Sequence, residues 1–206
     1  MSYVLVMHSF GLVTESAISW AHNGAAPGCE FVGVAEPELE VEREEGYFRR
    51  YEIVAELCRT KPAGTRWAYL DNDAVHLRRK TPLTPDLKGC CVGAVRCAGV
   101  KGILHNCGGL YGECGPGALR FLETVLEFKA AGLAFKDLHA DEHAFDLAAA
   151  KMPGAVAALD PAWNNWQKAT GERFLPAVVQ GFHAMAGSVK LAAVQASVKQ
   201  SVALDL

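Results

Sequence analysis

Two aspartates, Asp71 and Asp73, directly follow an apolar and aromatic run at residues 66–70 (RWAYL). In an extended chain, side chains two positions apart point to the same side, so both carboxylates can face one ion across Asn72. Carboxylate oxygens are ligands that Mg²⁺ and Mn²⁺ prefer, and open α/β sheets bind ligands outside the carboxyl ends of their strands. The pattern indicates a divalent cation that carries a diphosphate, although Asp-Asn-Asp is also ordinary turn chemistry.

The segment from His139 to His143 matches a second metal pattern, His-x-x-Glu-His. In a helix, its two histidines lie one turn apart and can bind zinc, while the glutamate activates a water molecule. The alternative is therefore a zinc metallopeptidase that uses His139, Glu142 and His143. It requires a helix that extends back through His139 and a third ligand further along the chain, and no second motif in that segment supports it.

The elements that must position these residues alternate between strands and helices. We expect strands near residues 3–7, 31–35, 66–70, 91–97 and 102–109, because these runs are apolar and end at glycines, prolines or polar residues. We expect helices near residues 14–21, after Pro37, between Pro116 and Gly132, from Asp141 to Met152 and from His183 to Gln200. This alternation predicts a single α/β domain over residues 1–206.

Composition narrows the class of protein. Half of the 206 residues are hydrophobic and only 21% are charged, which predicts a packed globular chain and excludes a disordered one. The formal net charge of -3 gives no broad electrostatic surface for nucleic acid. The sequence contains no long apolar run and no leader-like amino terminus, so we expect no membrane span and a cytoplasmic location. The seven cysteines fit reduced thiols better than a disulfide framework.

The run at residues 67–75 (WAYLDNDAV) resembles the strand and Asp-x-Asp motif of nucleotide-sugar glycosyltransferases of the GT-A fold. Further segments match in the family's order, and this order is more specific than any single motif. They are residues 106–111 (NCGGLY), the helix at 118–128, residues 141–145 (DEHAF), residues 161–164 (PAWN), and His183 with Gly187 and Lys190. The resemblance covers roughly residues 3 to 190 and implies a GT-A-like, Rossmann-like mixed sheet flanked by helices.

The resemblance also implies roles for particular residues. Asp71, Asp73 and His183 would bind Mn²⁺ or Mg²⁺, and the ion would bridge the diphosphate of an activated sugar. The donor would be bound by residues drawn from the loop after the first strand, a helix, the Asp-x-Asp motif, the Asn-Cys-Gly segment and the carboxyl-terminal helix: His8, Ser9, Gly11, Arg50, Asp71, Asn72, Asn106, Gly108 and Lys190.

Asp141 and Glu142 are the carboxylates that the resemblance places nearest the reacting carbon. An inverting enzyme would use one of them as a general base, whereas a retaining enzyme would use it to position the sugar. Which of the two faces the site stays open, and Asp141 is also a good helix N-cap. Trp163 and Asn164 are the expected substrate-binding pair, with Trp163 either a platform for the acceptor or part of the core.

The resulting prediction is a glycosyltransferase, of the hexosyltransferase type, that moves a sugar from a UDP-linked donor to a hydroxyl group of a saccharide, a protein or a modified nucleobase. Two other classes share the fold: a nucleotidyltransferase, and a nucleotide-binding module without turnover. Residues 8–11 (HSFG) contain no lysine or arginine, which counts against nucleotidyl transfer. Only an assay for product separates a transferase from a binding module.

Overall fold

A six-stranded mixed sheet forms the centre of the molecule. The computed structural model describes residues 2–10, 14–37, 43–96, 103–133, 139–166, 178–181 and 187–205. In spatial order the sheet is β2-β1-β3-β6-β5-β7. These strands are β2 (Cys29–Glu36), β1 (Tyr3–Phe10), β3 (Arg66–Asp71), β6 (His105–Glu113), β5 (Val92–Arg96) and β7 (Val156–Leu159).

Strand direction decides which residues can meet. β1 is parallel to β2 and β3, and β5 is parallel to β7, while β6 is antiparallel to β3 and β5 on either side. The carboxyl ends of β1, β2, β3, β5 and β7 therefore share one edge with the amino end of β6. We call this the carboxyl edge. Its register pairs His8 with Asp71 and Arg96 with His105.

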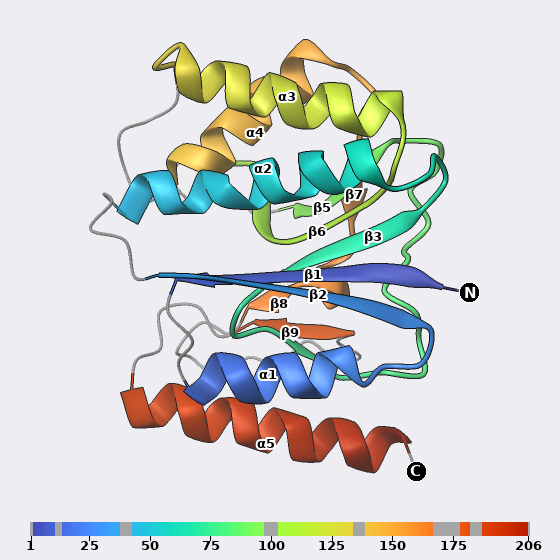
Figure 1. Cartoon of the computed structure of the whole chain (residues 1–206), viewed down its shortest axis with the longest axis vertical. Helices are drawn as coiled ribbons and strands as arrows, with labels where there is room; N and C mark the ends of the chain where they lie inside the picture. The colour runs from blue at the N-terminus through green and yellow to red at the C-terminus, as the bar shows by residue number, and fades with distance from the viewer. Residues whose placement is uncertain are drawn as a thin grey trace.

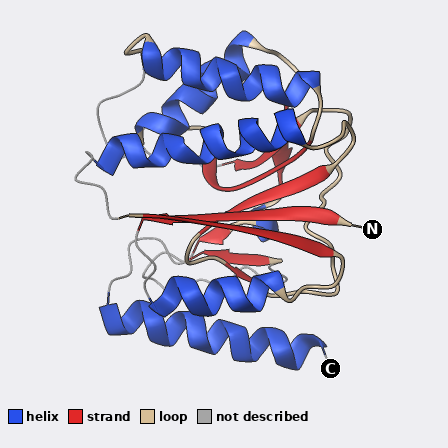
Figure 2. Ribbon diagram, viewed as in Figure 1, coloured by secondary structure: helices blue, strands red, loops and turns tan. Residues whose placement is uncertain are grey.

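Helices cover both faces of the sheet (Figure 1). One layer contains α2 (Arg43–Thr60), α3 (Pro116–Ala130) and α4 (Ala140–Lys151), and the opposite layer contains α1 (Thr14–Gly24) and α5 (Gly187–Asp205). Figure 2 shows the strands between these two helical layers. A small second sheet has the order β4-β9-β8, from β4 (Val75–His76), β9 (Val179–Gly181) and β8 (Asn165–Trp166), and a short 3₁₀ helix, η2 (Pro161–Trp163), precedes β8. None of the helices in the described ranges is long and apolar enough to span a bilayer.

The core lies on both faces of the sheet. Tyr51, Phe121 and Phe145 are fully buried among the helices α2, α3 and α4, where the Phe121 and Phe145 rings meet edge to face at 5.0 Å. Leu5 and Leu70 belong to a second buried cluster. Because these side chains fix the strands on both faces, the backbone at the carboxyl edge is held in place.

The expected α/β class, a mixed sheet flanked by helices, is confirmed. The expected strand at 102–109 is wrong in its bounds, since β6 continues through three glycines to Glu113. Two of these glycines provide close contacts. A Cβ at Gly112 would lie 2.2 Å from the Trp67 ring, and one at Gly109 would lie 3.2 Å from Asn164 Cβ. The glycines in this segment suggested the end of a strand, but they are positions where the strand backbone packs closely against neighbouring side chains.

Candidate active site

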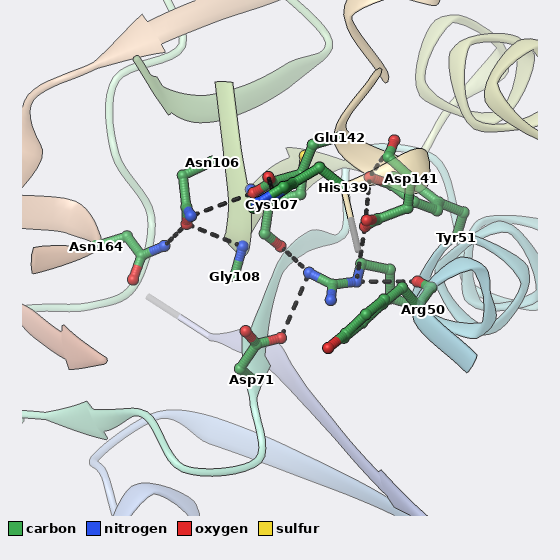
Figure 3. A network of polar contacts seen from close by, with 11 residues as sticks. Arg50, Tyr51, Asp71, Asn106, Cys107, Gly108, His139, Asp141, Glu142 and Asn164 are labelled. Carbon is green, nitrogen blue, oxygen red and sulfur yellow. Dashed lines mark hydrogen bonds and ion pairs between the residues drawn. The ribbon is translucent and has the colours of Figure 1, made fainter. Parts of the chain in front are cut away.

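Arg50 lies at the centre of a polar network at the carboxyl edge (Figure 3). From α2, its Nη1 lies 3.4 Å from Asp71 Oδ1 and its Nε lies 3.5 Å from Asp141 Oδ2. The guanidinium also donates to the backbone oxygens of Cys107 at 2.5 Å and Tyr47 at 3.0 Å. Only 8% of the Arg50 side chain is exposed. Its buried guanidinium therefore connects α2 to β3, β6 and α4 through these contacts.

One buried cation in this network faces two carboxylates. Burial lowers the pKa of Arg50, but the carboxylates of Asp71 and Asp141 outweigh it and hold the pKa well above its ordinary value. The buried Tyr69 phenol, whose ring lies 5.5 Å from the Arg50 guanidinium, has a pKa raised by burial, lowered by Arg50, and raised by Asp71, Asp141 and Asp73. Three carboxylates therefore act on one phenol beside the end of β3.

Glu142 is held by three donors. Its Oε1 accepts from Asn106 Nδ2 at 3.2 Å and from the Cys107 amide at 3.1 Å, and its Oε2 lies 2.8 Å from His139 Nδ1. Burial and the neighbouring Asp141 raise the pKa of Glu142, while the His139 and Cys107 contacts lower it. Consecutive carboxylates at the start of α4 thus have separate surroundings, with Asp141 facing Arg50 and Glu142 facing β6.

Asn106 extends this network across the edge. Its Oδ1 accepts from the Gly108 amide at 3.1 Å and from Asn164 Nδ2. Asn164 is 1% exposed, and its Oδ1 is buried without a hydrogen-bond partner in the described part of the chain. Trp163 packs edge to face on Tyr111 at 5.5 Å. The expected pair is therefore divided: Asn164 joins the polar network, whereas Trp163 packs against the core.

The ends of β1 and β2 form the neighbouring part of the edge. His8 Nε2 lies 3.1 Å from Glu36 Oε2, and Glu36 also pairs with Arg49 at 2.6 Å. Burial lowers the pKa of His8, and Glu36 opposes that shift. Ser9 Oγ accepts from Asn72 Nδ2 at 3.0 Å, which ties the end of β1 to the Asp-x-Asp segment. Three of the residues predicted to bind the sugar donor lie here, namely His8, Ser9 and Asn72. A fourth, Gly11, lies outside the described residues.

The extended geometry that we expected for residues 71–73 is wrong. β3 ends at Asp71, and the chain turns there, because the Ala74 amide donates to the Asp71 carbonyl oxygen at 2.9 Å. The alternation of side chains along a strand does not apply within a turn. As a result Asp71 faces Arg50 on α2, whereas Asp73 faces the opposite helical layer.

Asp73 is 5% exposed and forms an ion pair with Lys190 of α5. Only one of its oxygens takes part: Asp73 Oδ1 is buried and has no hydrogen-bond partner among the residues described. Lys190, predicted to contact phosphate, thus lies beside a predicted metal ligand. His183, the third predicted ligand, lies outside the described residues.

The zinc pattern gains no support from the described geometry. Helix α4 begins at Ala140, so His139 is its N-cap with non-helical dihedral angles, and the required extension of the helix is wrong. The carboxylate of Glu142 is occupied by β6 and His139. Within the ranges that the structure describes, no group of three or more histidine, cysteine, aspartate or glutamate side chains is arranged to hold a metal ion.

Three contributors to the network are absent from the predicted set. Glu36 ends β2, and a carboxylate at the end of a strand parallel to β1 is the same signal that identified Asp71. Tyr47 and Tyr51 lie on α2 with Arg50, and no motif in the sequence assigns them a polar role; Tyr47 contributes its backbone oxygen to Arg50. The Tyr51 hydroxyl donates to the Asp141 backbone oxygen at 3.4 Å.

A cavity of about 590 Å³ lies at the opposite edge of the sheet. It is lined by residues at the start of β3, the end of β6, the 84–91 loop and the start of α3, including Arg66, Trp67, Lys88, Cys91 and Glu113. None of the predicted site residues within the described ranges lines it.

No protein-family model and no curated protein matches the sequence. Solved structures of glycosyltransferases do match the fold. One is a glycosyltransferase involved in the glycosylation of the major capsid of PBCV-1, with a TM-score of 0.77 and 18% identity over 95% of this chain and 100% of that chain. Another is GlyE of Streptococcus pneumoniae TIGR4, with a TM-score of 0.59 and 10% identity over 99% of this chain. The present chain spans 63% of the GlyE chain. The protein therefore has a glycosyltransferase fold.

Proposed function

We propose that the protein is a metal-dependent glycosyltransferase that moves a hexose from a UDP-linked donor to a hydroxyl acceptor. The fold shared with the capsid glycosyltransferase over 95% of the chain carries the proposal. The polar network supports it, because it lies at the carboxyl ends of the strands, where open α/β sheets bind ligands.

Asp71, Asp73 and His183 are the residues that would hold Mn²⁺ or Mg²⁺. Asp73 is the described member that fits a hard cation, since its Oδ1 is a buried acceptor without a hydrogen-bond partner among the described residues, whereas Asp71 is paired with Arg50 on the other helical layer. When bound, the ion supplies Lewis-acid stabilisation of the charge that develops on the departing diphosphate. Lys190, paired with Asp73, adds a positive charge near the same phosphates.

The remaining residues bind and orient the donor. Ser9 and Asn72 are joined by a hydrogen bond at the ends of β1 and β3, and together with His8, which contacts Glu36, they form the proposed nucleoside side of the site. Asn106 and Gly108 present polar groups where the sugar would lie. Arg50 is buried beneath them, so its proposed role changes from donor contact to positioning residue: it fixes the carboxylates of Asp71 and Asp141.

The acceptor is proposed to be a saccharide or protein hydroxyl rather than a modified nucleobase. This choice is supported by the similar fold of the glycosyltransferase involved in the glycosylation of the major capsid of PBCV-1, and by the acidic net charge of -3.

The test measures UDP release and glycosylated product from a panel of UDP-hexoses with saccharide acceptors, with Mn²⁺ and with EDTA. Asp73→Asn should lower kcat/KM by about 10²-fold or more, since a catalytic metal contributes several kcal/mol. Asp86→Asn is the matched control, because Asp86 is exposed and caps a loop at the opposite edge. Undiminished activity in EDTA would reject the metal, and UDP binding without product would indicate a binding module.

A further inference from the structure

His139 combines exposure with a fixed carboxylate partner. One third of its side chain (33%) is exposed at the carboxyl edge, whereas 13% of the Glu142 side chain is exposed. The Nδ1 to Oε2 distance of 2.8 Å is that of a charge-assisted hydrogen bond. Because the Cys107 amide and Asn106 hold the other oxygen, Glu142 cannot swing away from the ring without breaking two further bonds.

This contact determines what the imidazole can do. An ionised carboxylate only accepts hydrogen bonds, so Nδ1 carries the hydrogen and Nε2 is left as the basic nitrogen of the ring. The carboxylate also stabilises the imidazolium that forms when Nε2 takes up a proton. A base that is itself oriented by a third group is the arrangement by which enzymes activate hydroxyl nucleophiles.

We propose that His139 is the catalytic base of the transfer reaction and that Glu142 is the positioning residue that orients it; this inference rests on the proposed function. His139 Nε2 takes the proton of the acceptor hydroxyl as its oxygen bonds to the anomeric carbon of the donor sugar. The bond from that carbon to the diphosphate oxygen breaks, and its electron pair leaves with the nucleoside diphosphate. The imidazolium then returns the proton to solvent.

The groups around the pair are compatible with this role. Asp141 on the same helix, the Cys107 thiol on β6 and Arg50 on α2 all act electrostatically on or near Glu142. Arg50 pairs with Asp141 and offsets part of its negative charge at Glu142. Glu142 is then the carboxylate in direct contact with the imidazole and can stabilise its protonated form.

A second histidine and carboxylate pair, between His105 at the start of β6 and Asp146 on α4, provides a matched control. His105 Nδ1 lies 2.7 Å from Asp146 Oδ1, and Asp146 also accepts from the Leu104 amide. The His105 ring packs on Phe145 at 5.4 Å, and only 13% of its side chain is exposed. Both pairs have the same contact between a histidine Nδ1 and a carboxylate oxygen. They differ in exposure, because the His139 side chain is more exposed than the His105 side chain.

The decisive variant is His139→Asn, because its amide nitrogen can take the place of Nδ1 against Glu142 while the basic nitrogen is removed. We expect kcat to fall by about 10²-fold or more, with UDP affinity and melting temperature near those of the wild type. His105→Asn should keep wild-type kcat. If His139→Asn keeps kcat within about threefold of the wild type, His139 is not the base.

Two further readouts separate chemistry from structure. The wild-type kcat/KM should fall with decreasing pH as one group protonates, and His139→Ala should lack this limb and regain activity with added imidazole. Glu142→Gln should lower kcat more than it raises KM, because the amide cannot support the same tautomer. Absence of transfer by the wild type would overturn the proposed function itself, whereas equal transfer by wild type and His139→Asn would overturn only this inference.

Discussion

Replacement of Arg50 by methionine tests the buried network most severely. The side chains of Arg50 and Asp141 are 8% and 3% exposed, so Arg50→Met leaves two carboxylates at the edge without their shared cation. Removal of one partner of a buried ion pair costs about 3–5 kcal/mol. For a chain of this size, each kcal/mol lowers the melting temperature by about 2–4 °C, so we expect a loss of about 6–20 °C.

Arg49→Met is the control, because Arg49 is the adjacent residue and pairs with Glu36 and Glu52 at 39% exposure. An exposed pair contributes about 0–1 kcal/mol. Both variants are compared by urea unfolding at pH 7. Equal losses in the two variants would refute the claim that Arg50 holds the site together.

Three further predictions concern other parts of the structure. Glu142→Gln should raise the melting temperature at pH 7 and lose this advantage as the pH falls below the ordinary carboxyl range. Burial raises the folded-state pKa of Glu142, so its ionised form destabilises the protein at neutral pH, a result checked by calorimetry at several pH values. Lys190→Met should lower the melting temperature by leaving its carboxylate partner unpaired, and Mn²⁺ should then stabilise the variant more than the wild type in a thermal-shift assay. Gly112→Ala should cost about 1–3 kcal/mol in urea unfolding because the new methyl group would meet the Trp67 ring, whereas Gly117→Ala, which meets only ordinary contacts at 3.4 Å or more, should be neutral or stabilising.

The sequence alone predicted the elements that carry the site. Apolar runs followed by polar residues identified β1 and the carboxyl end of β3, and therefore Asp71; the expected end of β1 at residue 7 is wrong, because His8 and Ser9 belong to the strand, which continues to Phe10. The start of α4 was predicted within one residue, which placed Asp141 and Glu142 together. These signals are local, because strand ends and helix caps depend on residues close in the chain.

The partners of these residues depend on contacts between distant segments, which local patterns do not contain. Asp71 and Asp73 were expected to face one side, yet Arg50 and Lys190 approach them from opposite helical layers. The separate surroundings of Asp141 and Glu142 likewise arise from the packing of α4 against α2 and β6.

The end of β6 was predicted wrongly for a different reason. Its glycines suggested that the strand ends, because glycine disfavours strands, but pairing with β3 on one side and β5 on the other overrides this preference.

The most direct test of the central claim is a crystal structure of the protein soaked with UDP and Mn²⁺. The diphosphate is expected at the carboxyl edge, between the ends of β1 and β3, with the metal ion at Asp73. Electron density for the nucleotide in the cavity beside Trp67 and Cys91, at the opposite edge of the sheet, would contradict the assignment of the active site.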